Sequence, residues 1–177
     1  TFSREFRMIE DEPYHRNWDE EELDNPVGRT DWVFNYLTNE ITVLGIFEIA
    51  DGENSPWNDL RKEIEHILFL DSITAIPKHA FCDCCKLEFL RIPKSITSIG
   101  TEAFSKCSSL TSISIPDSVI SIGDDAFHRC SSLTSILVPK SVLSLGNNVF
   151  SYCSNLASIT LLRTLSFIGE HAFSKCS

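Results

Sequence analysis

"SITSIGTEAFSKCSSLTSISIPD" (95–117) is followed at once by "SVISIGDDAFHRCSSLTSILVPK" (118–140), a second copy of nearly the same 23 residues. The register continues without gaps on both sides of this pair. Further full copies occupy 72–94 and 141–163, a partial copy occupies 164–177, and residues 64–71 match the tail of another unit. Self-similarity at a fixed period of this length is the signature of a repeat architecture.

The positions that recur in every copy are mostly apolar. Leu110, Ile113 and Phe104 return 23 residues later as Leu133, Ile136 and Phe127, with Ser, Thr and charged residues between them. A single unit cannot bury these side chains alone, whereas stacked units bury each other's. We therefore expect side chains 23 positions apart to lie directly above one another.

Each copy contains signals for two short elements. The alternation in "LTSISI" predicts a strand with Ile113 and Ile115 inward, ended by Pro116, which has no N–H to donate. The segment "GDDAFHRC" begins after a glycine and has acids first and an arginine last, which favours a short helical turn. The expected fold is an α/β solenoid whose parallel strands form one continuous sheet.

The pattern in "SIGDDAFHRCSSLTSILVPKSV" resembles the BspA-like leucine-rich repeats of bacterial and protist surface proteins. The resemblance covers 72–177 and extends back to about residue 31, where "DWVFNYLTNEITVLGIFEI" and "SPWNDLRKEI" are similar to the aromatic hairpin that precedes the repeats in that family. It implies a leucine-rich repeat solenoid. It also implies an adhesion module at the cell surface, attached to host matrix or to other cells.

The chain divides into three regions: an acidic arm (1–30), a cap with the first half repeat (31–71), and the repeats (72–177). Residues 31–50 predict a β-hairpin. In the following segment Ser55 suits an N-cap and Pro56 a first helical position, with Trp57, Leu60 and Ile64 on one helical face. We expect this hairpin and helix to cover the open end of the first coil, as solenoids require.

The opposite end of the array lacks such a cap in the sequence. The chain stops at "FSKCS" before the expected leucine and strand, so that "ASITL" (157–161) becomes an exposed apolar edge. This favours a longer natural array or end-to-end self-association through the C-terminal coil. The polar first residues, which lack an initiator methionine, contain no signal peptide, and no apolar run is long enough to span a membrane.

Charge is distributed unevenly along the chain. The net charge of −10 is made up of −5 in residues 1–30, −7 in 31–71 and +2 in 72–177. An acidic load of this size argues against nucleic acid as a partner. Residues 1–30 combine the run "DEEELD" with four aromatic residues, which is typical of a solvated arm.

Cysteines follow the same register. Five of them form a ladder at 23-residue spacing, and Cys82 and Cys85 are extras in the first full coil. Free cysteine behaves as a small apolar residue, so we expect a structural, buried ladder. A disulfide framework and a metal site are the alternatives; an odd count of seven and the lack of paired C-x-x-C motifs argue against both. The ladder residues are Cys84, Cys107, Cys130, Cys153 and Cys176.

No catalytic motif or cofactor fingerprint stands out. The histidines occupy repeat slots that also hold Glu, Asp, Asn or Ser, except for His15 and for His66, which lies beside Glu65. Serine belongs to the repeat itself, and no P-loop, dinucleotide or nucleophile-elbow motif is present. The sequence predicts a non-enzyme without cofactors or metal.

The outward side chains of the strands are the candidate partner-binding site. In a solenoid they form one surface on the concave side, with mixed charge and an exposed aromatic residue in the first coils and hydroxyls in the later ones. The candidate residues are Glu65, His66, Leu68, Glu88, Phe89, Arg91, Thr111, Ser112, Ser114, Thr134, Ser135, Leu137, Ser158 and Thr160, with Ala157 between the last pairs. We weight the surface toward Phe89 and Arg91, because short hydroxyls are simply tolerated on exposed strands.

The functional hypothesis is a non-catalytic protein-interaction module. The resemblance favours adhesion at the cell surface, with a host matrix or cell-surface protein as partner. The alternative is a cytoplasmic leucine-rich repeat scaffold that binds another protein, which the free cysteine ladder and the absent signal peptide support. An enzyme is the third reading.

Overall fold

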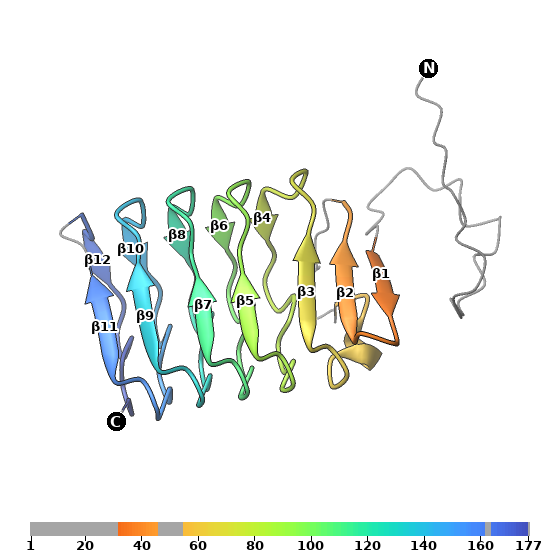
Figure 1. The fold of residues 1–177 in the computed structure, drawn as a ribbon. Coiled ribbons are helices and arrows are strands. Elements are labelled where there is room, and N and C mark those ends of the chain that lie inside the picture. Colours follow the sequence, from red (N-terminus) through yellow and green to blue (C-terminus); the bar gives the residue numbers. More distant parts are fainter. Residues whose placement is uncertain (1–31, 46–54, 162–163, 177) are drawn as a thin grey trace, which may run out of the picture.

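The computed structural model describes residues 32–45, 55–161 and 164–176, and the expected acidic arm lies outside them. The described chain winds into coils that stack side by side in one row, with strands on two opposite faces (Figure 1). The fold is therefore a β-solenoid of parallel strands: the predicted solenoid is confirmed, whereas the expected α/β class is wrong, because the described repeats contain strands and turns but no helix. Within the described ranges no helix is long and apolar enough to cross a membrane.

One face carries the strand of each repeat that the sequence predicts. These strands are β3 (His66–Phe69), β5 (Phe89–Arg91), β7 (Ser112–Ser114), β9 (Ser135–Val138) and β11 (Ser158–Leu161). The pairs β5–β7 and β9–β11 run parallel with partners 23 residues apart. The face is not one continuous sheet, because strand pairing is interrupted between β3 and β5 and between β7 and β9. We call it the strand face.

The opposite face holds a second parallel sheet, which the sequence reasoning missed. It contains β4 (Ala75–Ile76), β6 (Ser98–Ile99), β8 (Ser121–Ile122), β10 (Ser144–Leu145) and β12 (Phe167–Ile168). Two-residue strands are too short for an alternating pattern to reveal them. The glycine that follows each later strand permits close approach of neighbouring coils. A Cβ at Gly146 would lie 2.4 Å from the backbone nitrogen of Asp124.

Between the two faces, equivalent side chains form columns. The rings of Phe104 and Phe127 are stacked with centroids 5.5 Å apart and planes 5° apart, and Phe127 stacks on Phe150 at the same spacing. All three rings are fully buried. The central prediction, that positions 23 residues apart are vertical neighbours, is confirmed. At the N-terminal end Trp57 extends the column and stacks on Phe81 at 5.0 Å.

The prediction of a short helical turn in each repeat is wrong. The segment has residues with positive φ at two places, for example Asp125 (53°) and Arg129 (59°), which a right-handed helix excludes. Alternate N–H groups of the segment donate to the next coil: Phe104 to Ala126 at 2.8 Å and Lys106 to His128 at 2.7 Å. The N–H groups of Ala103 and Ser105 donate to carbonyls three residues earlier in their own turn. Hydrogen bonds between coils thus replace the intrahelical bonds that the charge pattern favoured.

Of the two predicted elements of the cap, the hairpin forms and the helix does not. The hairpin is confirmed in the described part, since β1 (Trp32–Asn35) and β2 (Glu40–Val43) pair antiparallel and β2 continues the strand face by pairing with β3. The helix is absent: only a 3₁₀ turn, Asn58–Leu60, forms between residues 55 and 65. The carbonyl of Asn39 accepts from the N–H groups of Glu65 and His66, so the chain must already be extended there.

Trp57 and Ile64 are nevertheless buried, as the proposed apolar face requires. Trp57 also donates its indole N–H to the carbonyl of Ala80 at 2.8 Å, which fixes the ring over the column. At the other end of the described chain, Ile168 is 46% exposed, whereas its equivalent Ile122 is 2% exposed. Association of chains through this coil stays a prediction.

Candidate functional site

The candidate binding residues lie together on the strand face. Glu65 and His66 are partly buried, and the other twelve residues are exposed, from Leu68 on β3 to Thr160 on β11. The period-two alternation of the strands produces this arrangement, since each outward residue is flanked by an inward one. In β5, for example, Leu90 is buried while Phe89 and Arg91 face solvent.

Apolar and charged side chains gather over the first two strands of this face. Phe89 is 53% exposed, and its ring lies 5.3 Å from that of His66 on β3 with a tilt of 45°. Leu68 on β3 and Arg91 on β5 occupy the same outward row, and Leu68 is also largely exposed. These four residues form what we call the Phe89 patch.

The border of the Phe89 patch is held by polar contacts that connect the cap to the coils. The side-chain amide of Asn39 donates to the carboxylate of Glu65 at 2.9 Å. Lys86 donates to the carboxylate of Glu63 at 2.7 Å, and this hydrogen bond raises the pKa of Lys86. An apolar centre with a polar, solvent-accessible rim is the usual anatomy of a protein interface.

The later coils present a different surface. Ser112, Ser135 and Ser158 form one outward row in register, since Ser112 pairs with Phe89 and Ser158 with Ser135. The hydroxyl of Thr111 donates to the carbonyl of Glu88 in the preceding coil at 2.9 Å, so it serves the stacking itself. Among the outward residues of β7 and β9, only Leu137 has a large apolar side chain that is exposed. Most of the large exposed side chains of the candidate residues therefore lie on β3 and β5.

The cysteine ladder forms part of the core. Cys107, Cys130 and Cys153 each donate their Sγ–H to the carbonyl of the phenylalanine 26 residues earlier, at 3.3 Å, and all are buried. Burial raises their pKa values, to about 12 for Cys153. All seven cysteines are free thiols, and Cys82, Cys85 and Cys176 are partly exposed.

One histidine contacts both a hydroxyl and a carboxylate group. His128 lies with Nδ1 2.6 Å from the hydroxyl of Ser151 and 3.5 Å from the carboxylate of Asp125. Because one ring nitrogen makes both contacts, the ring cannot relay a proton from serine to carboxylate as a catalytic triad does. Burial lowers the pKa of His128. Over the described ranges no group of three or more His, Cys, Asp or Glu side chains is arranged to hold a metal ion.

The comparisons with known proteins agree with the stacked geometry. Residues 61–177 match the family model described as "BspA type Leucine rich repeat region (6 copies)". The chain belongs to the BspA-type leucine-rich repeat family. Among curated proteins, none matches the chain significantly in sequence.

Several solved structures share the fold. A leucine-rich cell surface protein from Faecalibacterium prausnitzii A2-165 is 27% identical, with a TM-score of 0.62, over 85% of this chain and 47% of that protein. The T. pallidum leucine-rich repeat protein is 26% identical, with a TM-score of 0.59, over 83% of this chain and 64% of that one. The chain thus spans between about half and two thirds of these relatives. The pneumococcal vaccine antigen PcpA, 19% identical with a TM-score of 0.50 over 85% of this chain and 47% of that one, supports the fold alone.

Proposed function

We propose that the chain is a non-catalytic protein-binding module displayed at a cell surface, and that the Phe89 patch is the centre of its binding site. The observation that carries the proposal is the exposure of Phe89 on rigid β-structure beside Arg91, with Leu68 and His66 around it. Aromatic and arginine side chains dominate binding energy at interfaces. The preferred partner is a host matrix protein or a protein on another cell.

The cell-surface location rests on the relative from F. prausnitzii, which is a cell surface protein of the same fold. The buried thiols of the ladder do not oppose an oxidising location. Cys107 and Cys130 are buried with raised pKa values, so they expose little thiolate to oxidants. The cytoplasmic scaffold remains the alternative, and it would use the same face.

The test compares two double variants on one face. Phe89→Ala/Arg91→Ala removes the centre of the Phe89 patch, while Ser112→Ala/Ser114→Ala changes the equivalent outward positions of β7. Binding to immobilised collagen, laminin and fibronectin is measured by surface plasmon resonance. We expect the first variant to lose roughly tenfold or more in affinity and the second to bind as the wild type does.

The binding result is read beside the unfolding midpoint of each variant, because loss of the ring contact between Phe89 and His66 also affects the strand pair. Unchanged affinity of a folded Phe89→Ala/Arg91→Ala variant for a matrix protein that the wild type binds would refute the assignment of the site. Equal losses in both double variants would refute its location in the first coils.

A further inference from the structure

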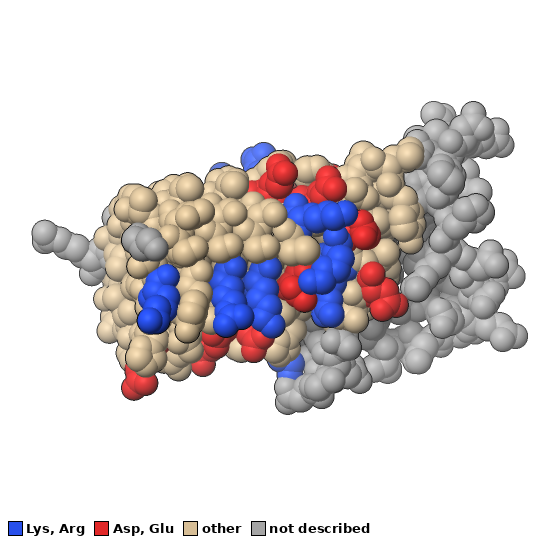
Figure 2. Space-filling model, turned by 90° about the horizontal axis from the view of Figure 1, so that it is seen from below, with Lys and Arg blue, Asp and Glu red and all other residues tan. Residues whose placement is uncertain are grey.

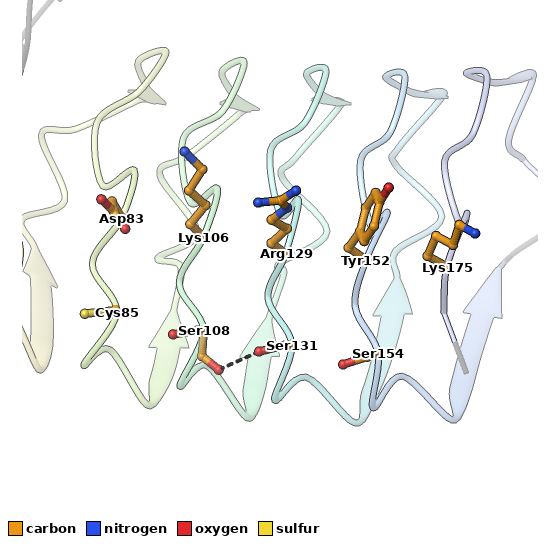
Figure 3. Close-up of a pocket in the computed structure, with 9 residues that line it drawn as sticks. All are labelled: Asp83, Cys85, Lys106, Ser108, Arg129, Ser131, Tyr152, Ser154 and Lys175. Carbon is orange, nitrogen blue, oxygen red and sulfur yellow. Dashed lines mark hydrogen bonds between the residues drawn. The ribbon is translucent and has the colours of Figure 1, made fainter.

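A second surface lies on the edge of the coils formed by the turns that contain the cysteine ladder. There a shallow groove with a volume of about 420 Å³ crosses the repeats from the coil of Asp83 to that of Lys175. Figure 2 shows lysine and arginine side chains following one another along this side of the molecule. In Figure 3 the residues that line the groove fall into two rows, long side chains in one and mostly serines in the other.

The long side chains occupy one repeat slot, the residue before each ladder cysteine. We call Lys106, Arg129, Tyr152 and Lys175 the basic row. Backbone hydrogen bonds hold successive members in register: the N–H of Arg129 donates to Ser151 at 2.9 Å, and that of Tyr152 donates to Ser174 at 2.8 Å. One member is therefore presented per coil, at the spacing of neighbouring strands, about 5 Å.

The charged side chains of the basic row have no ion-pair partner among the described residues. Within the described ranges, Lys106, Arg129 and Lys175 have no carboxylate at ion-pair distance. The guanidinium of Arg129 lies 5.2 Å from the centre of the Tyr152 ring, a cation–π arrangement that leaves its N–H groups available. The row begins at Lys106, because Asp83 in the preceding slot is paired with Lys62 at 2.8 Å.

The backbone at this slot makes the choice of residues unusual. Lys106, Arg129, Tyr152 and Lys175 all have positive φ, between 59° and 63°. A left-handed conformation costs a bulky residue roughly 1–2 kcal/mol, and glycine or asparagine suits it better. The backbone conformation at these positions therefore does not favour long side chains.

A second left-handed column in the same coils supplies the comparison. Four residues before each of these slots stand His79, Glu102, Asp125, Asn148 and His171, with φ between 53° and 57°. Asn, Asp and His are the types that tolerate this conformation, so that column, apart from Glu102, follows local preference. The basic row departs from it at four successive coils. The basic row keeps a strained backbone conformation at an open, charged surface. Such strain is typical of a functional site.

We propose that this groove binds a linear polyanionic polysaccharide, such as a sulfated glycan, laid along the solenoid with one sugar unit per coil. Lys106, Arg129 and Lys175 would pair with sulfate or carboxylate groups. The half-exposed ring of Tyr152 offers a flat apolar surface to one sugar ring. The serine row, Ser108, Ser131 and Ser154, supplies hydroxyls for the sugar hydroxyls.

The spacing favours a glycan over an acidic peptide. A sugar ring advances an extended glycan by about the same length as one coil. Anionic groups on one face recur every second ring, so they meet every second coil and stay in register with the row. An extended peptide places side chains of one face about 6.6 Å apart, twice the rise per residue, and falls out of register within a few coils. This surface is distinct from the Phe89 patch, so the inference does not depend on the function proposed above.

The experiment uses a short heparin oligosaccharide as the probe. Lys106→Asn/Arg129→Asn removes two charges of the basic row, and Lys94→Asn/Lys140→Asn removes two exposed charges from a different repeat slot as a matched control. We expect the wild type and the control to bind heparin with an affinity that falls as salt rises, and the first variant to bind roughly tenfold or more weakly with a shallower salt dependence. Because asparagine suits the left-handed slot, that variant should unfold at or above the wild-type midpoint.

Three outcomes would overturn the proposal. Equal losses in both double variants would mean that total charge, and not the groove, determines binding. Binding of poly-glutamate as tightly as heparin would assign the groove to acidic polypeptides. Failure of the wild type to bind heparin at low salt would rule out the proposed ligand class.

A further variant tests the stacking contact. Loss of heparin binding in Tyr152→Asn that does not depend on salt would support this contact.

Discussion

The middle coils and the C-terminal coil consist of the same repeat, but their equivalent residues lie in different surroundings. Phe127 is stacked by Phe104 on one side and by Phe150 on the other, at 5.5 Å each. Phe173 stacks on Phe150 at 5.7 Å and is only partly buried. The coil that follows therefore covers one side of each coil's core, and a residue's contribution to stability depends on its layer as well as its type.

The largest effect that tests this comparison is expected for the aromatic column. Phe127→Ala should lower the free energy of unfolding by about 3–5 kcal/mol, because it leaves a cavity between two fixed neighbours. Phe173→Ala should cost less than half as much, since its site is already partly open. Urea denaturation followed by circular dichroism measures both, with Phe127→Leu as a control for volume. Equal losses would show that stability does not depend on the layer.

A smaller effect is expected from the cysteine ladder at alkaline pH. Burial raises the pKa of the Cys130 thiol well above its ordinary value. The folded protein then keeps a proton that the unfolded chain releases, so stability is complete below about pH 8.5 and falls as the pH rises further, by about 1.4 kcal/mol per pH unit for each buried thiol.

Cys130→Ser should reduce that slope by about one thiol's share, while its hydroxyl can still donate to the carbonyl of Phe104. Cys176→Ser should reduce it less, because Cys176 is only partly buried. Urea midpoints measured between about pH 8 and pH 10 give the slopes. A slope unchanged by Cys130→Ser would show that this thiol does not stay protonated in the folded state.

The smallest effect concerns one hydroxyl column. The hydroxyl of Ser141 is buried without a hydrogen-bond partner among the described residues, whereas that of Thr164, one coil later, donates to the carbonyl of Lys140 at 2.6 Å. Ser141→Ala should leave stability unchanged or raise it by up to about 1 kcal/mol, and Thr164→Val should lower it by about 0.5–1.5 kcal/mol. Differential scanning calorimetry resolves the two signs. Destabilisation by Ser141→Ala would imply a bound water at that hydroxyl.

Features of the fold that depend on the repeated residues themselves could be predicted from the sequence. Features that depend on hydrogen bonds from the neighbouring coil could not. The Phe104 and Phe127 stack was predictable because apolar side chains at a fixed period must share a core. The turn at Asp125 was not, because its backbone N–H donates to Asn147 in the next coil, and no pattern within one repeat reports that bond. Acids after a glycine then imitate a helix start.

The two surfaces differ in the same way. The exposure of Phe89 and Arg91 on the strand face followed from period-two alternation, while their role in binding stays a prediction. The basic row was also visible as the residue before each cysteine in "SKC", "HRC", "SYC" and "SKC". Its meaning was hidden, because a helical turn at Lys106 and Arg129 would have concealed that both residues have positive φ.

The glycine contacts and stacked rings that join each coil only to its neighbours have an evolutionary consequence. A tandem duplication or deletion of one 23-residue block would leave every remaining interface intact, as the register of Ser121 with Ser144 and of Ser144 with Phe167 illustrates. Each added block would bring another outward rung. Recombination alone could thus change the avidity for a long, repetitive ligand in steps of one repeat, without any new type of contact.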